Sequence, residues 1–209
     1  MRVSSDSFQD GQRIPEECAF GKHDPVSHFT FAGNHNPHLR WSELPAGTRS
    51  LALICQDADA PSRADDVNQE GRTVPASLPR ATFTHWVLVD LPATVAAIAA
   101  GEYSDGVTPR GKQARSGPHG TRQGPNDYTG WFAASPEMAG SYFGYDGPAP
   151  PWNDEIRHRY AFTLYALDVP ACPVDGELTA AAVLAAIRGH VLAQATLTGV
   201  YAINPAVGI

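Results

Sequence analysis

The chain has 209 residues, of which 43% are hydrophobic and 18% are charged, a composition typical of a folded protein with a sizeable core. Its formal net charge is −7 and no cluster of Lys and Arg interrupts the acidic balance, which argues against nucleic acids or anionic membranes as partners. Three widely spaced cysteines (Cys18, Cys55 and Cys172) match neither a zinc motif nor a disulfide framework. We therefore expect no metal.

The distribution of glycine and proline favours a β-rich chain. The sequence holds 19 glycines and 18 prolines in many short clusters, as turns between strands require. The first residues contain no apolar stretch of signal-peptide length, and no span approaches the length needed to cross a membrane. No repeat or linker marks a boundary. The sequence therefore predicts a single domain over residues 1–209, soluble and cytoplasmic, without stable membrane insertion.

Apolar runs predict three strands, at residues 50–56, 83–91 and 160–167. The intervening residues 62–82 are polar and rich in turn formers, so we expect a long surface loop that is functional or disordered. Residues 95–100 fit a short helix.

The remaining segments divide into irregular and helical parts. Residues 101–129 and 140–157 hold too much Gly and Pro to be regular throughout. Residues 178–192 are rich in Ala and Leu, with apolar side chains at helical spacing, which predicts a C-terminal helix.

Two carboxylates mark the exit of the first predicted strand. Asp57 and Asp59 follow the apolar run directly, and Pro61 fixes the direction of the chain. Side chains two positions apart in an extended segment point the same way, so both acids are expected to line one depression. For Asp59 we give equal weight to an alternative in which it only holds the turn by accepting backbone N–H bonds.

Polar residues also stand at the starts of the other two predicted strands. His85 precedes an apolar run of four residues, and His158 and Tyr160 open the third strand. Arg159 lies between them and is expected to point the opposite way, as a surface or ion-pairing residue. If these strand ends meet, they form a cup with carboxylates on one side and imidazoles on the other. His23, His28, His35 and His38 show no metal-ligand spacing and are interpreted as surface histidines.

Four motifs in order resemble the phosphatidylethanolamine-binding protein family. They are Asp57-Ala-Asp59-Ala-Pro61, Thr84-His85-Trp86-Val87-Leu88, Gly147-Pro-Ala-Pro-Pro151 and His158-Arg159-Tyr160. The segments Asn126 to Phe132 and Phe162 to Asp168 are similar to its bacterial branch, often called Raf-kinase-inhibitor-like. The resemblance extends from about Phe8 to Asn204, nearly the whole chain.

The resemblance implies a mainly β fold, an antiparallel β-sandwich with a few short helices and a C-terminal helix beside a shallow pocket. In that family the pocket takes anions such as phosphate, acetate or a phospholipid head group. It further implies a homodimer and a cis Ala60–Pro61 peptide bond. Carried over by position, the pocket residues would be Asp57, Asp59, Pro61, His85, Pro150, His158 and Tyr160.

The chain departs from the family pattern in several places. Ala58 stands where Pro is common, and Phe83 and Thr84 replace residues seen before the His in eukaryotic members. Ala149 stands where bacterial relatives often carry Cys, which argues against a thiol-dependent role. The loop over residues 62–82 is longer than in eukaryotic relatives. These differences put eukaryote-like partner binding in doubt.

The predicted function is a non-enzymatic binding protein for a small anion or phosphorylated group. Imidazoles and a Tyr hydroxyl donate hydrogen bonds to such ligands, and a carboxylate behind a His favours its charged form. Anion binding is therefore expected to strengthen as the pH falls into the His titration range. Two alternatives stay open: an enzyme using the Asp/His pocket for acid–base chemistry, and a regulator that binds a protein kinase or another protein. The sequence shows no activated Ser or Cys, no set of metal ligands and no cofactor-binding loop that would favour an enzyme. We expect no cofactor.

Overall fold

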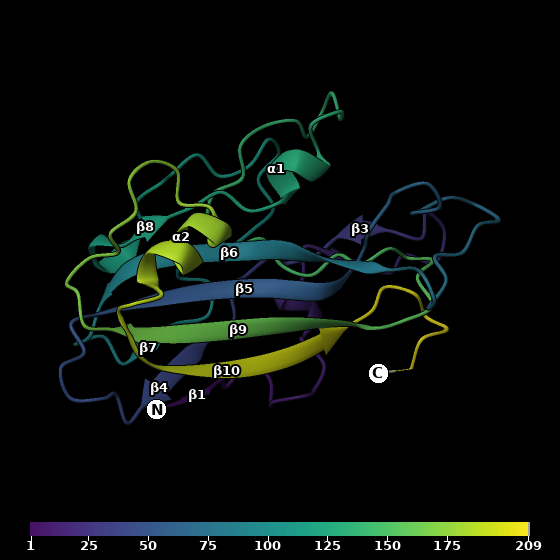
Figure 1. Ribbon diagram of the computed structural model, residues 1–209. Helices are drawn as coiled ribbons and strands as arrows, with labels where there is room; N and C mark the ends of the chain where they lie inside the picture. Colours follow the sequence, from purple (N-terminus) through teal and green to yellow (C-terminus); the bar gives the residue numbers. More distant parts are fainter. Residues whose placement is uncertain (209) are drawn as a thin grey trace.

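A computed structural model describes residues 1–208, and strands dominate it (Figure 1). The strands are β1 (Arg2–Ser4), β2 (Gly21–Lys22), β3 (Thr30–Phe31), β4 (Leu39–Ser42), β5 (Ser50–Pro61), β6 (Arg80–Pro92), β7 (Ala97–Ile98), β8 (Arg122–Gln123), β9 (His158–Leu167) and β10 (Val191–Tyr201). The helices are α1 (Tyr128–Trp131) and α2 (Ala180–Ile187), with short 3-10 turns η1 (Glu16–Cys18) and η2 (Pro118–Gly120). The mainly β prediction is confirmed.

Five strands form the central antiparallel sheet in the order β10-β9-β5-β6-β8. The three strands predicted from apolar runs are its middle members, and each is longer than predicted. A smaller sheet has the order β1-β4-β7, and β2 pairs with β3. The short helix expected at residues 95–100 is wrong, because β7 pairs there with β4.

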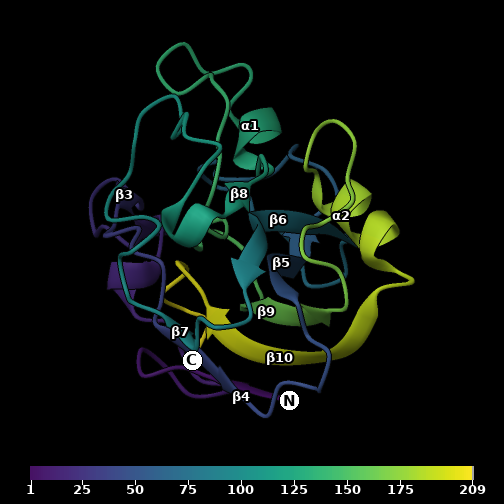
Figure 2. The ribbon, with the colours of Figure 1, turned by 90° about the vertical axis from the view of Figure 1, so that its left-hand side faces the viewer.

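The two faces of the central sheet bury different sets of side chains. On one face, Leu53, Trp86 and Phe162 pack with Leu39 and Ile98 of the smaller sheet, and together they form the main core. On the other face, side chains of the alternating β5 and β6 positions pack beneath α2 (Figure 2). Period-two alternation along β5, β6 and β9 therefore separates the two layers.

The prediction of a helix reaching Leu192 is wrong in its second half. Thr179 caps α2 by accepting a hydrogen bond from the Ala182 backbone, and the helix ends at Ile187. From Val191 the chain becomes β10, which pairs with β9 as far as Tyr201 apart from a bulge at Leu192. Gly189 separates the two elements.

The placement of α2 also corrects an implication of the family resemblance. The helix packs over Ala52, Ile54, Val87 and Val89, well before the end of β5 that carries Asp57. The helix that lines the same pocket as Asp57 is instead the short α1, which contributes Tyr128 and Trp131. Within the described residues, no helix has the length and hydropathy that a membrane span needs.

Candidate functional site

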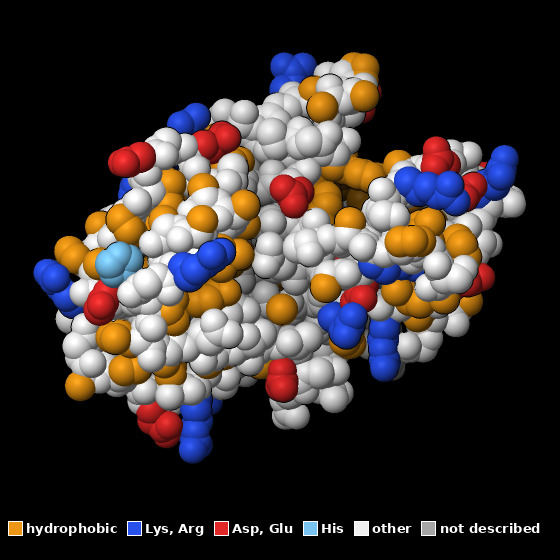
Figure 3. All heavy atoms as spheres, in the orientation of Figure 1, with side chains coloured by type: hydrophobic (Ala, Val, Ile, Leu, Met, Phe, Trp, Pro, Cys, Tyr) orange, Lys and Arg blue, Asp and Glu red, His pale blue; other side chains and the backbone are white. Residues whose placement is uncertain are grey.

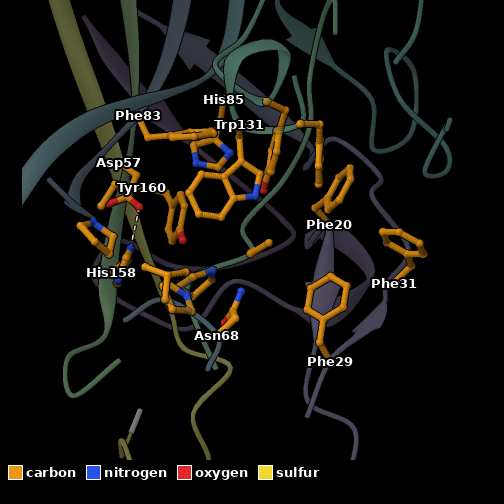
Figure 4. Close-up of a pocket in the computed structure, with 18 residues that line it drawn as sticks. Phe20, Phe29, Phe31, Asp57, Asn68, Phe83, His85, Trp131, His158 and Tyr160 are labelled. Carbon is orange, nitrogen blue, oxygen red and sulfur yellow. Dashed lines mark hydrogen bonds and ion pairs between the residues drawn. The ribbon is translucent and has the colours of Figure 1, made fainter. Parts of the chain in front are cut away.

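A pocket of about 250 Å³ lies where β5 leaves the central sheet. Residues of β5, β6 and β9 form one side of it, and α1, β3 and the turn around Pro150 form the other. The space-filling view shows a hollow lined with hydrophobic side chains in this region, near α1 and β3 (Figure 3). The close-up separates a polar end, with Asp57 and His158, from an aromatic end, with Phe20, Phe29 and Phe31 (Figure 4).

A β-bulge in β6 places His85 in the pocket. Cys55 pairs with Trp86 and Gln56 pairs with Thr84, so His85 has no partner on β5. Strict alternation would send His85 to the face opposite Trp86, under α2. The extra residue instead brings His85 to the pocket side, where its ring lies 5.1 Å from that of Tyr160.

A second bulge, in β5, separates the two acids that follow the strand. The pairing is interrupted between Asp57 and Ala60, so the two carboxylates do not share one side. Asp57 lines the pocket, whereas Asp59 does not. The Asp59 carboxylate binds the Arg159 guanidinium at 2.7 Å and accepts the Arg159 backbone N–H at 3.0 Å. The expectation that both acids line one depression is therefore wrong, and Arg159 makes the ion pair expected of it.

His158 is held between two carboxylates. Its Nδ1 donates to Asp57 at 2.7 Å (the dashed line in Figure 4), and its Nε2 donates to Asp154 at 3.1 Å. Because an ionised carboxylate only accepts, both ring nitrogens must carry protons, and the ring is an imidazolium. Asp154 in turn receives two hydrogen bonds from Arg80, at 2.6 and 3.0 Å. The four groups together carry no net charge.

The pKa of His158 follows from this arrangement. Burial by itself lowers the pKa, but hydrogen bonds and charge attraction from Asp154 and Asp57 outweigh it and raise the pKa from 6.5 to about 9. The side chain of His158 is 1% exposed, as is that of Asp154. The ring is therefore charged over the physiological range, and both of its N–H donors are occupied by the protein.

His85 is the opposite case. Its Nδ1 lies 2.8 Å from the Asp146 carbonyl oxygen, which can only accept, so this nitrogen carries the proton. Burial lowers the pKa of His85, and attraction from Asp57 and the bond to Asp146 offset it only in part. The neutral ring thus leaves Nε2 without a proton, and no hydrogen bond from the described residues reaches it.

Tyr160 contributes a second polar atom that the protein leaves free. The residue is 1% exposed and lines the pocket, yet no hydrogen bond from the described residues reaches its hydroxyl. Burial raises the pKa of Tyr160 well above 10, so the hydroxyl keeps its proton and is a donor. At its polar end, the pocket therefore presents a donor on Tyr160 beside an unprotonated nitrogen on His85.

Buried hydrogen bonds fix the elements around these two groups. The Asp146 carboxylate binds Lys112 at 2.6 Å and the amides of Asn34 and Asn126 at 2.8 Å each, which holds its carbonyl against His85. Asp127 accepts the Thr84 backbone N–H at 2.6 Å and so ties α1 to β6. These polar residues are far apart in the sequence.

Two loops complete the rim. Asn153 donates to the backbone carbonyls of Asp66 and Arg72 at 2.8 and 3.1 Å, which orders the loop predicted at residues 62–82. That loop contributes Val67 and Asn68 to the pocket. The turn that contains Gly147 and Pro150 packs closely against the backbone at Cys18. A Cβ on Gly147 would lie 2.1 Å from the Cys18 carbonyl oxygen. Only glycine fits there.

Six of the seven residues predicted for the site surround the pocket, the exception being Asp59. They are Asp57, Pro61, His85, Pro150, His158 and Tyr160. The predicted cis bond before Pro61 is wrong, since the peptide bonds of the described residues are all trans.

The sequence did not reveal the groups that set the charge of the pocket. Arg80 and Asp154 lie 74 residues apart and meet only in the folded chain. Asp154 stands four residues before His158, a spacing that brings side chains together in a helix. The segment between them is not helical, so this spacing alone does not predict their contact. The aromatic residues of α1 belong to a segment that resembles the family, but nothing in the sequence places their side chains in the pocket.

Comparisons with known proteins agree with the fold and the motif order. The sequence model of the family described as phosphatidylethanolamine-binding protein matches residues 4–202. A UPF0098 protein of Methanothermobacter thermautotrophicus is 32% identical over 96% of this chain and 98% of its own length. YbhB of Escherichia coli is 29% identical over 96% and 99% of the two chains.

A solved structure extends the comparison to three dimensions. The crystal structure of E. coli YbcL, described as a new member of the mammalian PEBP family, matches with a TM-score of 0.68 and 28% identity. The match covers 97% of this chain and 98% of YbcL. This chain therefore belongs to the phosphatidylethanolamine-binding protein family.

Proposed function

We propose that the chain is a binding protein whose pocket holds a small anion or a phosphorylated head group. The observation that supports this most strongly is the pair of free polar atoms, Tyr160 Oη and His85 Nε2, side by side in a pocket rich in aromatic side chains. Pockets of this kind use a few polar groups to orient a ligand and apolar walls to exclude water. Family membership supports a binding role in general.

The charge arrangement assigns different tasks to the two histidines. His158 has no donor left for a ligand, but its positive charge compensates Asp57, which would otherwise repel an anion. The ligand contacts are assigned to the Tyr160 hydroxyl and to His85. His85 donates from Nε2 only when it takes up a proton, so binding of an anion and protonation of His85 favour each other.

Calorimetry with inorganic phosphate and with sulfate tests this proposal. Affinity is expected to rise as the pH falls from 8 to 5.5, by at most about tenfold per pH unit, because each bound anion takes up one proton at His85. Sulfate is the necessary control, since its charge is constant over this range. Affinity that is flat, or that increases with pH, would contradict the proposal.

Two tyrosine variants locate the site. Tyr160→Phe removes only the hydroxyl and is expected to weaken sulfate binding by about tenfold, the effect of one hydrogen bond to a charged group. Tyr165→Phe is the matched control, because Tyr165 lies on the same strand but packs on the α2 side of the sheet. Equal affinities of the two variants would exclude this pocket.

The remaining expectations belong to the same proposal. A single domain is supported by the main core, to which both sheets contribute. A cytoplasmic location is supported by three cysteines that are buried and unbonded in the described residues, as in a reducing compartment. The homodimer stays a prediction that analytical ultracentrifugation tests.

A further inference from the structure

Aromatic side chains are the largest group among the residues that line the pocket, and this composition has a consequence for the ligand. Eight lining residues carry six-membered aromatic rings: Phe20, Phe29, Phe31, Phe83, Tyr128, Trp131, Phe132 and Tyr160. The other apolar lining residues are prolines, alanines and one valine, so the lining has no Leu, Ile or Met. Rings and prolines form stiff, flat surfaces, unlike the flexible side chains that adapt to an acyl chain.

The rings form one connected series from the mouth to the polar end. Phe31 meets Phe20 edge-on at 5.5 Å, and Phe20 stacks on Tyr128 at 4.6 Å. Tyr128 meets His85 edge-on at 5.5 Å, and His85 meets Tyr160 at 5.1 Å. When the anionic group of a ligand binds the Tyr160 hydroxyl, the part of the ligand attached to that group therefore lies against aromatic rings.

Two large apolar side chains at this wall are unusually exposed. Trp131 is 48% exposed and Phe31 is 47% exposed, although both line the pocket. The Trp131 indole N–H makes no hydrogen bond within residues 1–208, and α1, which carries it, is held to β6 by Asp127. A bound ring would cover apolar surface that otherwise faces water.

The size of the pocket limits what this ring is attached to. A volume of about 250 Å³ lies below the usual range for ligand sites. A pocket of this size suits a small ligand with one head group and one ring.

We propose that the natural ligand is a small aryl anion, in which a phosphate or carboxylate is joined to a planar aromatic ring. The anion lies at Tyr160 and His85, and the ring lies against Trp131, Phe132 and Phe20. This inference rests on the proposed function, because it assumes that the anion occupies the polar end.

Binding of three probes at pH 6 tests the inference: phenyl phosphate, cyclohexyl phosphate and inorganic phosphate. Phenyl phosphate is expected to bind about 2- to 10-fold more tightly than cyclohexyl phosphate, the gain of one aromatic pair over plain apolar contact. N-acetyl-phosphotyrosine amide is expected to bind no more tightly than phenyl phosphate, because a pocket of about 250 Å³ holds the phosphate and the ring and leaves the backbone in solvent. Tighter binding of this amide would overturn the assignment to a small free molecule.

A variant with Trp131→Leu and Phe132→Leu isolates the contribution of the wall. The ratio of phenyl to cyclohexyl affinity, which does not depend on how far the variant weakens phosphate binding itself, is expected to fall towards one. Leu192→Ala, which changes an exposed side chain on β10 outside the pocket, is the control and should leave all affinities unchanged. A wild-type ratio at or below one, or a ratio that the double variant leaves unchanged, would overturn the inference. Failure of all three probes to bind wild type would instead contradict the proposed function.

Discussion

His158 and His85 lie on strands that flank β5 and line the same pocket, yet their ring nitrogens meet different partners. His158 faces two carboxylates, which raise its pKa to about 9. His85 faces a backbone carbonyl, and burial lowers its pKa. The comparison teaches that depth of burial does not set the charge of a histidine when its hydrogen-bond partners differ in charge. The His158 ring is therefore a permanent cation in the pocket wall, whereas the His85 ring can take up a proton when an anion binds.

Removing the carboxylate that His158 shares with Arg80 is the strongest way to break this comparison. In Asp154→Ala, two buried cations lose their partner, and the free energy of unfolding is expected to fall by about 3–5 kcal/mol. Urea denaturation at pH 7 measures the change.

A surface pair of the same residue types provides the control for this variant. His190 and Asp168 lie 2.9 Å apart, with side chains 39% and 47% exposed. Because water screens such a pair, Asp168→Ala is expected to cost at most about 1 kcal/mol. Equal losses for Asp154→Ala and Asp168→Ala would show that the buried network does not stabilise the fold.

Raising the pH sharpens the comparison without a mutation. Since the folded state holds the His158 proton more tightly than the unfolded state, its stabilising contribution is complete below pH 6.5 and is lost as the pH rises through about 9. The full difference corresponds to about 3 kcal/mol. Urea denaturation of wild type and of His158→Gln at pH 7 and at pH 10 measures this contribution. The difference in the free energy of unfolding between the two proteins is expected to be smaller at pH 10. A difference independent of pH would mean that His158 is neutral in the folded protein.

The smallest effect is expected at Asp59, the acid that the β5 bulge turns away from the pocket. Arg159 holds the pKa of Asp59 below its usual value, but the Arg159 side chain is 64% exposed. Asp59→Asn is therefore expected to cost about 1 kcal/mol or less in urea denaturation and to leave sulfate affinity unchanged. Loss of sulfate binding in this variant would show that Asp59 belongs to the ligand-binding site.

The sequence predicted the parts of this molecule that depend on local patterns. Apolar runs located β5, β6 and β9, and the motif order identified the family and six pocket residues. It failed where the outcome depends on pairing between distant segments. The Ala- and Leu-rich residues after Gly189 carry helix formers, but pairing with β9 makes them a strand.

The bulges explain the errors at the site. A single extra residue reverses the side-chain alternation that places Asp57 and Asp59 together, and the same kind of irregularity brings His85 into the pocket. Arg80 and Asp154 could not be paired from sequence, because 74 residues separate them and neither stands in a recognised motif.

An NMR titration of the imidazole rings, with and without sulfate, tests the central claim most directly. The account predicts that His158 titrates near pH 9 in both conditions, whereas His85 titrates below 6.5 in the free protein and shifts upward when sulfate binds. A His158 that titrates near 6.5, or a His85 that sulfate leaves unchanged, would contradict the division of labour between the two histidines.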